Sequence, residues 1–217
     1  MRYYISDLHF FHKGINERMD NRGFKDVEEM NEYMIKRWNI RVRKNDEVVV
    51  LGDLSFAKAD KTNEILNKLN GRIYLCIGNH DKWVKEKNAN LDRFEKIEHY
   101  LELNDNGRKV ICCHYPIMCY NGQFRKDENG NPKTYMLHGH IHNTQDNIGV
   151  EYYKDFIRKF PRRSRSTDVP MPAPINIINC FCMFSNYVPW TLDEWIKFDK
   201  EEMSLDRVKN DWYYDNR

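Results

Sequence analysis

Apolar runs of strand length alternate with helical patterns along this chain. Seven stretches rich in apolar and β-branched residues predict strands, at Tyr3–Ser6, Glu47–Leu51, Arg72–Ile77, Ile97–Leu103, Lys109–His114, Tyr135–His138 and Pro174–Phe184. Helical patterns separate the first strands, whereas the later strands follow one another more closely. This order predicts an α/β fold in which more than one sheet is packed into a sandwich.

Four stretches predict helices. The clearest begins at Asp26, because Asp26 and Glu29 have the spacing of a capping box. Apolar residues then recur on one face, at Val27, Met30, Met34 and Trp38. A second helix is predicted over Lys61–Asn70, where a glycine follows as its stop signal. Two further helices are predicted after Asn79 and from about Thr191.

The composition is typical of a globular protein and does not indicate any class of partner. Its 217 residues fit one domain over 1–217, and 41% hydrophobic with 31% charged residues is typical of a globular protein. A net charge of +2 favours neither nucleic acid nor any other charged partner, so such binding would need a local patch. No apolar run approaches a membrane span, and a strand follows Met1 almost directly, which leaves no room for a signal peptide. The six cysteines form no CxxC pair, so we expect reduced thiols and a cytoplasmic protein with no membrane partner.

One basic stretch interrupts the pattern of the second half. The sequence KDFIRKFPRRSRSTD at Lys154–Asp168 has six basic and two acidic residues, and the proline-rich VPMPAP follows it. Charge and prolines together predict an exposed insertion at about 150–173. Its arginines either attract a polyanion such as a nucleotide or nucleic acid, or belong to a solvated surface loop.

Polar residues of metal-binding type stand at the ends of five predicted strands. They are Asp7 and His9; Asp53; Asn79, His80 and Asp81; His114; and His138, His140 and His142. Each group alone is compatible with an ordinary turn, but ligands in open α/β sheets bind where strands end. Mixed oxygen and nitrogen donors suit Mn, Fe, Zn or Ni, and they exceed what one tetrahedral ion needs. The sequence therefore predicts two ions bridged by one carboxylate.

The same residues carry a resemblance to a known family. The motifs DLH, GDLS, GNHD, CHYP and GHIH, in this order between positions 7 and 142, resemble the signature of the calcineurin-like metallophosphoesterases. The stretch INIINCFCMFSNYVPWTLDEW resembles the closing strand and helix of small bacterial and phage members. The resemblance implies a single-domain sandwich of two mixed sheets flanked by helices.

The resemblance also implies a role for each residue. In the family pattern the first metal is held by Asp7, His9 and His142, the second by Asn79, His114 and His140, and Asp53 bridges the two. Manganese is the preferred metal of the pair. His80 is not a ligand but points at the phosphate, where it either steadies developing charge or protonates the leaving oxygen, and Asp81 helps to orient it. A hydroxide between the metals then attacks phosphorus.

The departures from relatives narrow the substrate. Protein Ser/Thr phosphatases and diadenosine tetraphosphate hydrolases carry GDxxDRG, whereas this chain reads GDLSFAK, without the phosphate-binding arginine. A phosphodiesterase is therefore favoured, with a phosphomonoesterase or nucleotide pyrophosphatase as the alternative. A non-catalytic scaffold of the same fold is a more remote alternative. His12 either reaches the leaving group of the substrate or faces solvent, His138 packs beneath the site or orients a ligand, and the oligomeric state stays open.

Overall fold

The chain forms two four-stranded sheets packed face to face. The computed structural model describes residues 1–160, 162–163, 168–171 and 174–201. The first sheet is wholly parallel, with neighbouring strands β1 (Arg2–Ile5), β2 (Glu47–Val50), β3 (Arg72–Cys76) and β4 (Phe94–Glu98). The second is mixed, in the order β10 (Ile177–Asn179), β7 (Thr134–His138), β6 (Arg108–Cys113) and β5 (Tyr100–Asp105), and only β5 and β6 pair antiparallel. The prediction of mixed sheets is therefore confirmed for the second sheet, whereas the first sheet is parallel.

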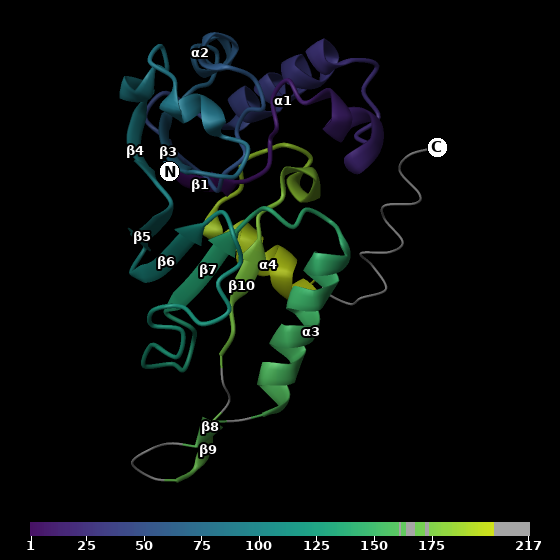
Figure 1. Ribbon diagram of the computed structural model, residues 1–217. Helices are drawn as coiled ribbons and strands as arrows, with labels where there is room; N and C mark the ends of the chain where they lie inside the picture. The colour runs from purple at the N-terminus through teal and green to yellow at the C-terminus, as the bar shows by residue number, and fades with distance from the viewer. Residues whose placement is uncertain (161, 164–167, 172–173, 202–217) are drawn as a thin grey trace.

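Helices cover the two outer faces of this sandwich (Figure 1). The first sheet is covered by α1 (Val27–Arg41) and α2 (Ala59–Leu66), and the second by α3 (Gln145–Lys159). The last helix, α4 (Leu192–Glu201), packs Leu192 and Trp195 into the core between the sheets. Short helical turns lie in the connections, at η1 (Ile15–Met19), η2 (Lys82–Lys85), η3 (Leu91–Arg93) and η4 (Cys182–Ser185).

Side-chain alternation along the strands produces these layers. On β1, Tyr3 and Ile5 pack with the α1 and α2 side chains, whereas Tyr4 points into the core between the sheets. On β6, Val110 and Cys112 face that same inner core. Strands with apolar residues on both faces are buried on both faces, which is why the sequence shows continuous apolar runs rather than strict alternation.

Most of the predicted elements are present, and the differences have local causes. The capped helix begins as expected, with Asp26 accepting a hydrogen bond of 2.8 Å from the Glu29 backbone N–H. The prediction of a single strand at Ile97–Leu103 is wrong, because the chain leaves β4 near His99 and enters β5 in the other sheet. The stretch after Asn79 forms only the short turn η2, and the long strand predicted at Pro174–Phe184 is reduced to β10 followed by η4.

Helix α3 is the element that the sequence pattern missed. The insertion expected from about residue 150 begins as the last part of α3, which continues to Lys159, buries Val150 and Lys154 and leaves Tyr152 and Phe156 exposed. The Lys154 ammonium pairs with Glu151 on its own helix and with Asp199 on α4. Beyond the helix the hairpin strands β8 (Arg162–Arg163) and β9 (Pro170–Met171) extend away from the sheets (Figure 1), and residues 161, 164–167 and 172–173 of the insertion lie outside the described part.

The remaining expectations concern cysteines and membranes. All six cysteines are free thiols, and four are buried, at Cys76, Cys112, Cys180 and Cys182. These four therefore act as small core residues. Within the described residues, no helix combines the length and apolarity needed to cross a bilayer.

Candidate metal centre

Loops that follow β1, β2, β3, β6 and β7 bring the candidate ligands to one edge of the sandwich. In parallel strands the carboxyl ends share an edge, so residues remote in sequence become neighbours. The backbone conformation also marks these loops as unusual. Five of the candidates have positive φ angles: Asp7 (56°), His9 (52°), Asp53 (52°), His140 (71°) and His142 (43°). Such a conformation is costly for a residue with a side chain and concentrates at functional sites.

A first group consists of Asp7, His9 and His142. One ligand atom of each lies within 4.8 Å of the others, and all three side chains are buried. His142 Nε2 is 3.5 Å from Asp7 Oδ1 and 3.3 Å from His9 Nε2. Two imidazole nitrogens and a carboxylate oxygen that converge in this way form a site for a transition metal.

A second group contains Asp7, Asp53 and His114, again within 4.8 Å of one another. Asn79 adds an oxygen, since its Oδ1 lies 3.0 Å from His114 Nε2. The Asp53 Oδ2 atom is 3.5 Å from His9 Nε2 and 3.4 Å from His114 Nε2, so this carboxylate contacts both groups. The exposed ring of His140 stands beside the second group, 5.0 Å from the His114 ring between centroids, without joining it.

The histidines of both groups are oriented as metal ligands are. Each turns Nε2 toward the carboxylates while Nδ1 is engaged elsewhere: by the Leu51 carbonyl at 2.9 Å for His114, by Asp20 at 2.7 Å for His142 and by His12 at 3.3 Å for His9. A ligating histidine normally uses its second nitrogen in this way, which fixes the ring and its tautomer. The residues of the two groups are therefore suited to binding divalent metal ions.

The carboxylates of the centre stabilise positive charge on two of its histidines, His114 and His142, whereas burial lowers the pKa of His9. Burial opposes ionisation of Asp7, but His142 outweighs it and holds the pKa of the Asp7 carboxyl well below its usual range. Burial likewise disfavours the charged form of His142, yet the charge of Asp7 and the bond with Asp20 raise its pKa to about 10. For His114, the bond with Asp53 and the charge of Asp7 outweigh burial and raise the pKa to about 9. A bound cation would displace these protons, because histidine ligates in its neutral form.

Three glycines pack directly against the candidate ligands. A Cβ atom on Gly52 would lie 2.3 Å from the His114 ring, and one on Gly78 would lie 2.2 Å from Asp53 Oδ1. A Cβ on Gly139 would lie 2.5 Å from Asp7 Oδ2. The glycines in the GD, GN and GH motifs therefore make room for the side chains of other motifs.

Asp81 connects the loops that carry the candidate ligands. Within the described residues, its buried carboxylate accepts N–H groups from the loops on either side, namely the backbone of Asp53, Leu54, Ser55 and Gly78 and the indole of Trp83. No bond between this carboxylate and the His80 ring is recorded among the described residues, so an orienting role of Asp81 would act through the loops that it holds. The His80 backbone is instead held by Asp53, whose Oδ1 accepts its N–H at 2.8 Å.

The two further histidines lie in different surroundings. His12 is partly buried and stacks on Phe56, with ring centroids 3.9 Å apart and planes 5° from parallel. Burial and the nearby charges of His80 and Arg22 lower its pKa to about 4. His138 is fully buried, and its Nδ1 donates to the Gly139 carbonyl at 2.8 Å. Among the described residues no hydrogen bond of its Nε2 is recorded, so the ring does not bond to a candidate ligand.

Sequence reasoning missed Asp20 and Arg22. Besides holding His142, Asp20 accepts two bonds from the Arg22 guanidinium, at 3.0 and 2.8 Å. Arg22 also donates to the carbonyls of Asp7 and Leu8, at 2.8 and 2.7 Å, and so fixes the loop that follows β1. Both side chains are buried, but an Asp-x-Arg in a loop carries no sequence signal, because its partner His142 is 122 residues away from Asp20.

Asp20→Asn is expected to weaken Mn²⁺ binding by about 10- to 100-fold, because a carboxylate fixes the ring and raises the basicity of a ligating histidine. Titration against a fluorescent chelator measures this. Asp26→Asn is the matched control, since asparagine is also a good helix cap at that position. Unchanged affinity in Asp20→Asn would show that Asp20 does not orient His142.

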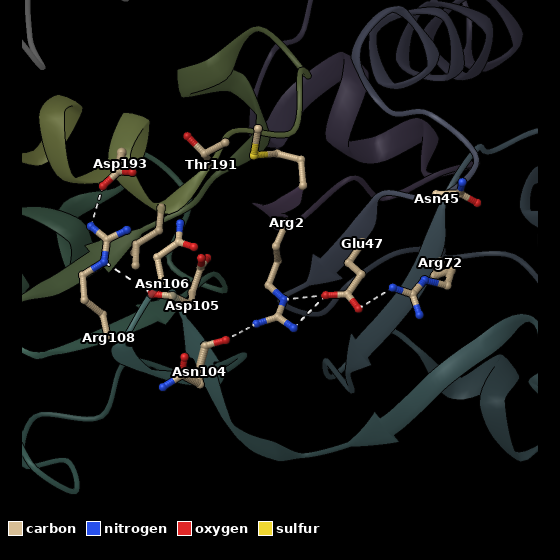
Figure 2. A pocket seen from close by; sticks show the side chains of 12 residues that line it. Arg2, Asn45, Glu47, Arg72, Asn104, Asp105, Asn106, Arg108, Thr191 and Asp193 are labelled. Atoms are coloured by element: carbon tan, nitrogen blue, oxygen red, sulfur yellow. Dashed lines mark hydrogen bonds and ion pairs between the residues drawn. The ribbon is translucent and has the colours of Figure 1, made fainter.

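A different hollow lies at the opposite ends of the strands (Figure 2). It measures about 540 Å³ and is lined by the starts of β1, β2 and β3 and by the β5–β6 turn. Its arginines are already paired, Arg2 and Arg72 with Glu47, each at 2.7 Å, and Arg108 with Asp193. Arg2 also donates to the Asn104 carbonyl at 2.6 Å, so this network joins the two sheets rather than offering charge to a ligand.

Comparison with known proteins decides the family. Residues 3–197 match the sequence model described as calcineurin-like phosphoesterase. The chain belongs to the calcineurin-like phosphoesterase family. This confirms the resemblance of the DLH, GDLS, GNHD, CHYP and GHIH motifs, and it makes metal-dependent hydrolysis of phosphate esters the chemistry to which the centre is suited.

One similar sequence and one similar structure extend the comparison. This phosphoesterase is 39% identical over 142 residues, which is 64% of this chain and 68% of the relative, to the uncharacterized protein MJ1445 of Methanocaldococcus jannaschii. The crystal structure of the protein of unknown function AQ665 from Aquifex aeolicus is similar in fold, with a TM-score of 0.61 and 23% identity. That match covers 92% of this chain and 98% of the other, so the fold is shared over nearly the whole length.

Proposed function

We propose that this phosphoesterase is a phosphodiesterase that works with two divalent metal ions. The position of Asp53 carries the proposal, because its Oδ2 lies within 3.5 Å of one histidine from each group. In this assignment Asp53 would be a ligand of both ions. Asp7, His9 and His142 would hold the first ion, and Asn79, His114 and His140 would hold the second. The mixture of carboxylate, amide and imidazole donors favours Mn over Fe, Zn and Ni, all of which such a set accommodates.

When bound, the two cations supply a water of lowered pKa as nucleophile and neutralise charge on the phosphate oxygens. The protein positions this chemistry through Asp53, which accepts the His80 backbone N–H and places the His80 ring 5.3 Å from that of His9, between centroids. From there His80 donates a proton to the leaving oxygen. Asp81 keeps the loops that carry Asp53 and His80 at a constant separation.

The charge of the surroundings favours a diester over a monoester. Among the described residues, the cationic side chain with recorded bonds to this centre is Arg22, and it is buried. Its guanidinium is committed to Asp20 and to the carbonyls of Asp7 and Leu8. Within the part of the chain that the structure describes, no arginine or lysine with recorded bonds at this centre is left to meet the second negative charge of a monoester dianion, whereas a diester carries a single negative charge.

The test compares bis-p-nitrophenyl phosphate with p-nitrophenyl phosphate, with added Mn²⁺ and with chelator. We expect the diester to be cleaved with the higher kcat/KM, the activity to disappear with chelator and to return with Mn²⁺. Metal content of the same preparation is measured by mass spectrometry.

The other outcomes point to the other functions. Faster cleavage of the monoester would replace the diesterase with a phosphomonoesterase, and cleavage of nucleotide anhydrides alone would indicate a nucleotide pyrophosphatase. A protein that neither binds Mn²⁺ nor cleaves either ester would be a scaffold with this fold.

A further inference from the structure

Two half-exposed aromatic rings lie against the candidate metal centre. Phe56 is 50% exposed and Tyr115 is 45% exposed. Single exposed apolar side chains are common and need no explanation. These two differ because their rings contact histidines of the centre: Phe56 lies 5.3 Å from His80, and Tyr115 lies 4.5 Å from His140, between centroids.

The Phe56 ring is held in place by the stacked ring of His12 and by the hydrogen bond of the Phe56 backbone. The Phe56 N–H donates to the Phe10 carbonyl at 3.0 Å, and Ser55 pairs with Phe10 in a β-bridge. His12 covers one face of the ring in a nearly parallel stack, and His12 is itself held by His9 at 3.3 Å. Half of the residue is exposed although His12 covers one face of the ring, so part of Phe56 remains open to a ligand.

The Phe56 ring also lies near the residue that the proposed function places at the leaving group, namely His80. His80 is the group assigned to protonate the leaving oxygen, and its ring lies 5.3 Å from both His9 and Phe56. Phe56 is therefore an exposed aromatic ring within reach of a planar substituent on that oxygen. A flat ring is the shape that extends a stack of His12 and Phe56 by one more layer.

We infer that Phe56, supported by His12, seats a planar aromatic ring of the leaving group, so that the substrates are nucleoside or aryl phosphate esters rather than alkyl ones. The inference rests on the proposed function, because it uses His80 to locate the leaving group. It adds a ring-binding subsite, made by Phe56, to the metal centre.

The test uses two probes that differ only in the base, adenosine 5′-monophosphate and ribose 5-phosphate. Calorimetric titration of the Mn²⁺-loaded protein is expected to show that the adenosine probe binds about fivefold tighter or more, as stacking of one base on an aromatic side chain gives. In Phe56→Leu, which keeps an apolar side chain without a ring face, the ratio of the two dissociation constants is expected to fall toward one. Phenyl phosphate against methyl phosphate repeats the comparison for a simple aryl ring and separates ring recognition from base recognition.

Phe156→Leu is the matched control, because Phe156 is 57% exposed on α3 and contacts Phe160 rather than the centre. It should leave the ratio as in the wild type. Equal binding of both probes to the wild type would overturn the inference, as would a ratio that falls in Tyr115→Leu but not in Phe56→Leu.

The binding readout separates this inference from the proposed function. Chelator-sensitive cleavage of diesters with a probe ratio of one would refute the ring subsite and leave the diesterase. A ratio that depends on Phe56, in a protein that cleaves no diester, would support the ring subsite and refute the diesterase.

Discussion

Asp53→Asn is expected to lower kcat/KM for bis-p-nitrophenyl phosphate by roughly a thousandfold or more, because a bridged pair of ions contributes several kcal/mol to the transition state. The Asp53 side chain is buried and its Oδ2 contacts both His9 and His114, so an amide in its place removes negative charge that both groups share. Metal content should fall together with activity. Steady-state kinetics and mass spectrometry of the bound metal measure the two effects on one preparation.

Two other variants make this result specific. Asp92→Asn alters an exposed aspartate in η3 and should change neither activity nor metal content. His80→Ala should retain both ions while kcat falls by about 10²- to 10⁴-fold, the usual contribution of a positioned acid or base. Full activity and full metal content in Asp53→Asn would refute the bridging assignment, and metal loss in His80→Ala would make His80 a ligand.

Gly52→Ala is expected to lower the free energy of unfolding by roughly 3 kcal/mol, from strain of a positive φ and overpacking together. Gly52 has a φ of +89°, and the added Cβ would lie 2.3 Å from His114 Nδ1. The displaced His114 ring would also lose its 2.9 Å bond to the Leu51 carbonyl, so binding of the second ion should weaken as well. Urea unfolding measures stability, and chelator titration measures the metal.

Gly149→Ala is the matched control for the same chemical change. Gly149 lies inside α3, and nothing lies within 4 Å of its added Cβ. There alanine should stabilise the protein by about 0.5–1 kcal/mol, because glycine is a poor helix former. If Gly52→Ala were as stable as the wild type, the His114 ring would have room to move, and the glycine would not be required by the metal centre.

The candidate ligands could be predicted because each one directly follows an apolar run. Asp7, Asp53, Asn79 and His114 each come within three residues of the end of a strand. Parallel strands place such ends at a common edge whatever the details of packing, so neighbours in space follow from a pattern that is local in sequence. The family membership over residues 3–197 agrees with that pattern.

Other features depend on partners that are distant in the sequence. The basic stretch around Lys154 predicted exposure, since lysine is rarely buried without a counter-charge, but α4 brings Asp199 to it. The apolar stretch around His99 reads as one strand, and only the packing of two sheets divides it between them.

The sequence by itself therefore determined the fold class and the residues that meet at the strand ends, because hydrophobic period and strand order are local properties. The tertiary structure alone decided what holds those residues in place. Asp20 behind His142, the Asp81 carboxylate between two loops and His12 beneath Phe56 are contacts between loops. Loop contacts have no periodicity, and a polar residue in a loop looks the same in sequence whether solvent or a buried partner receives its hydrogen bonds.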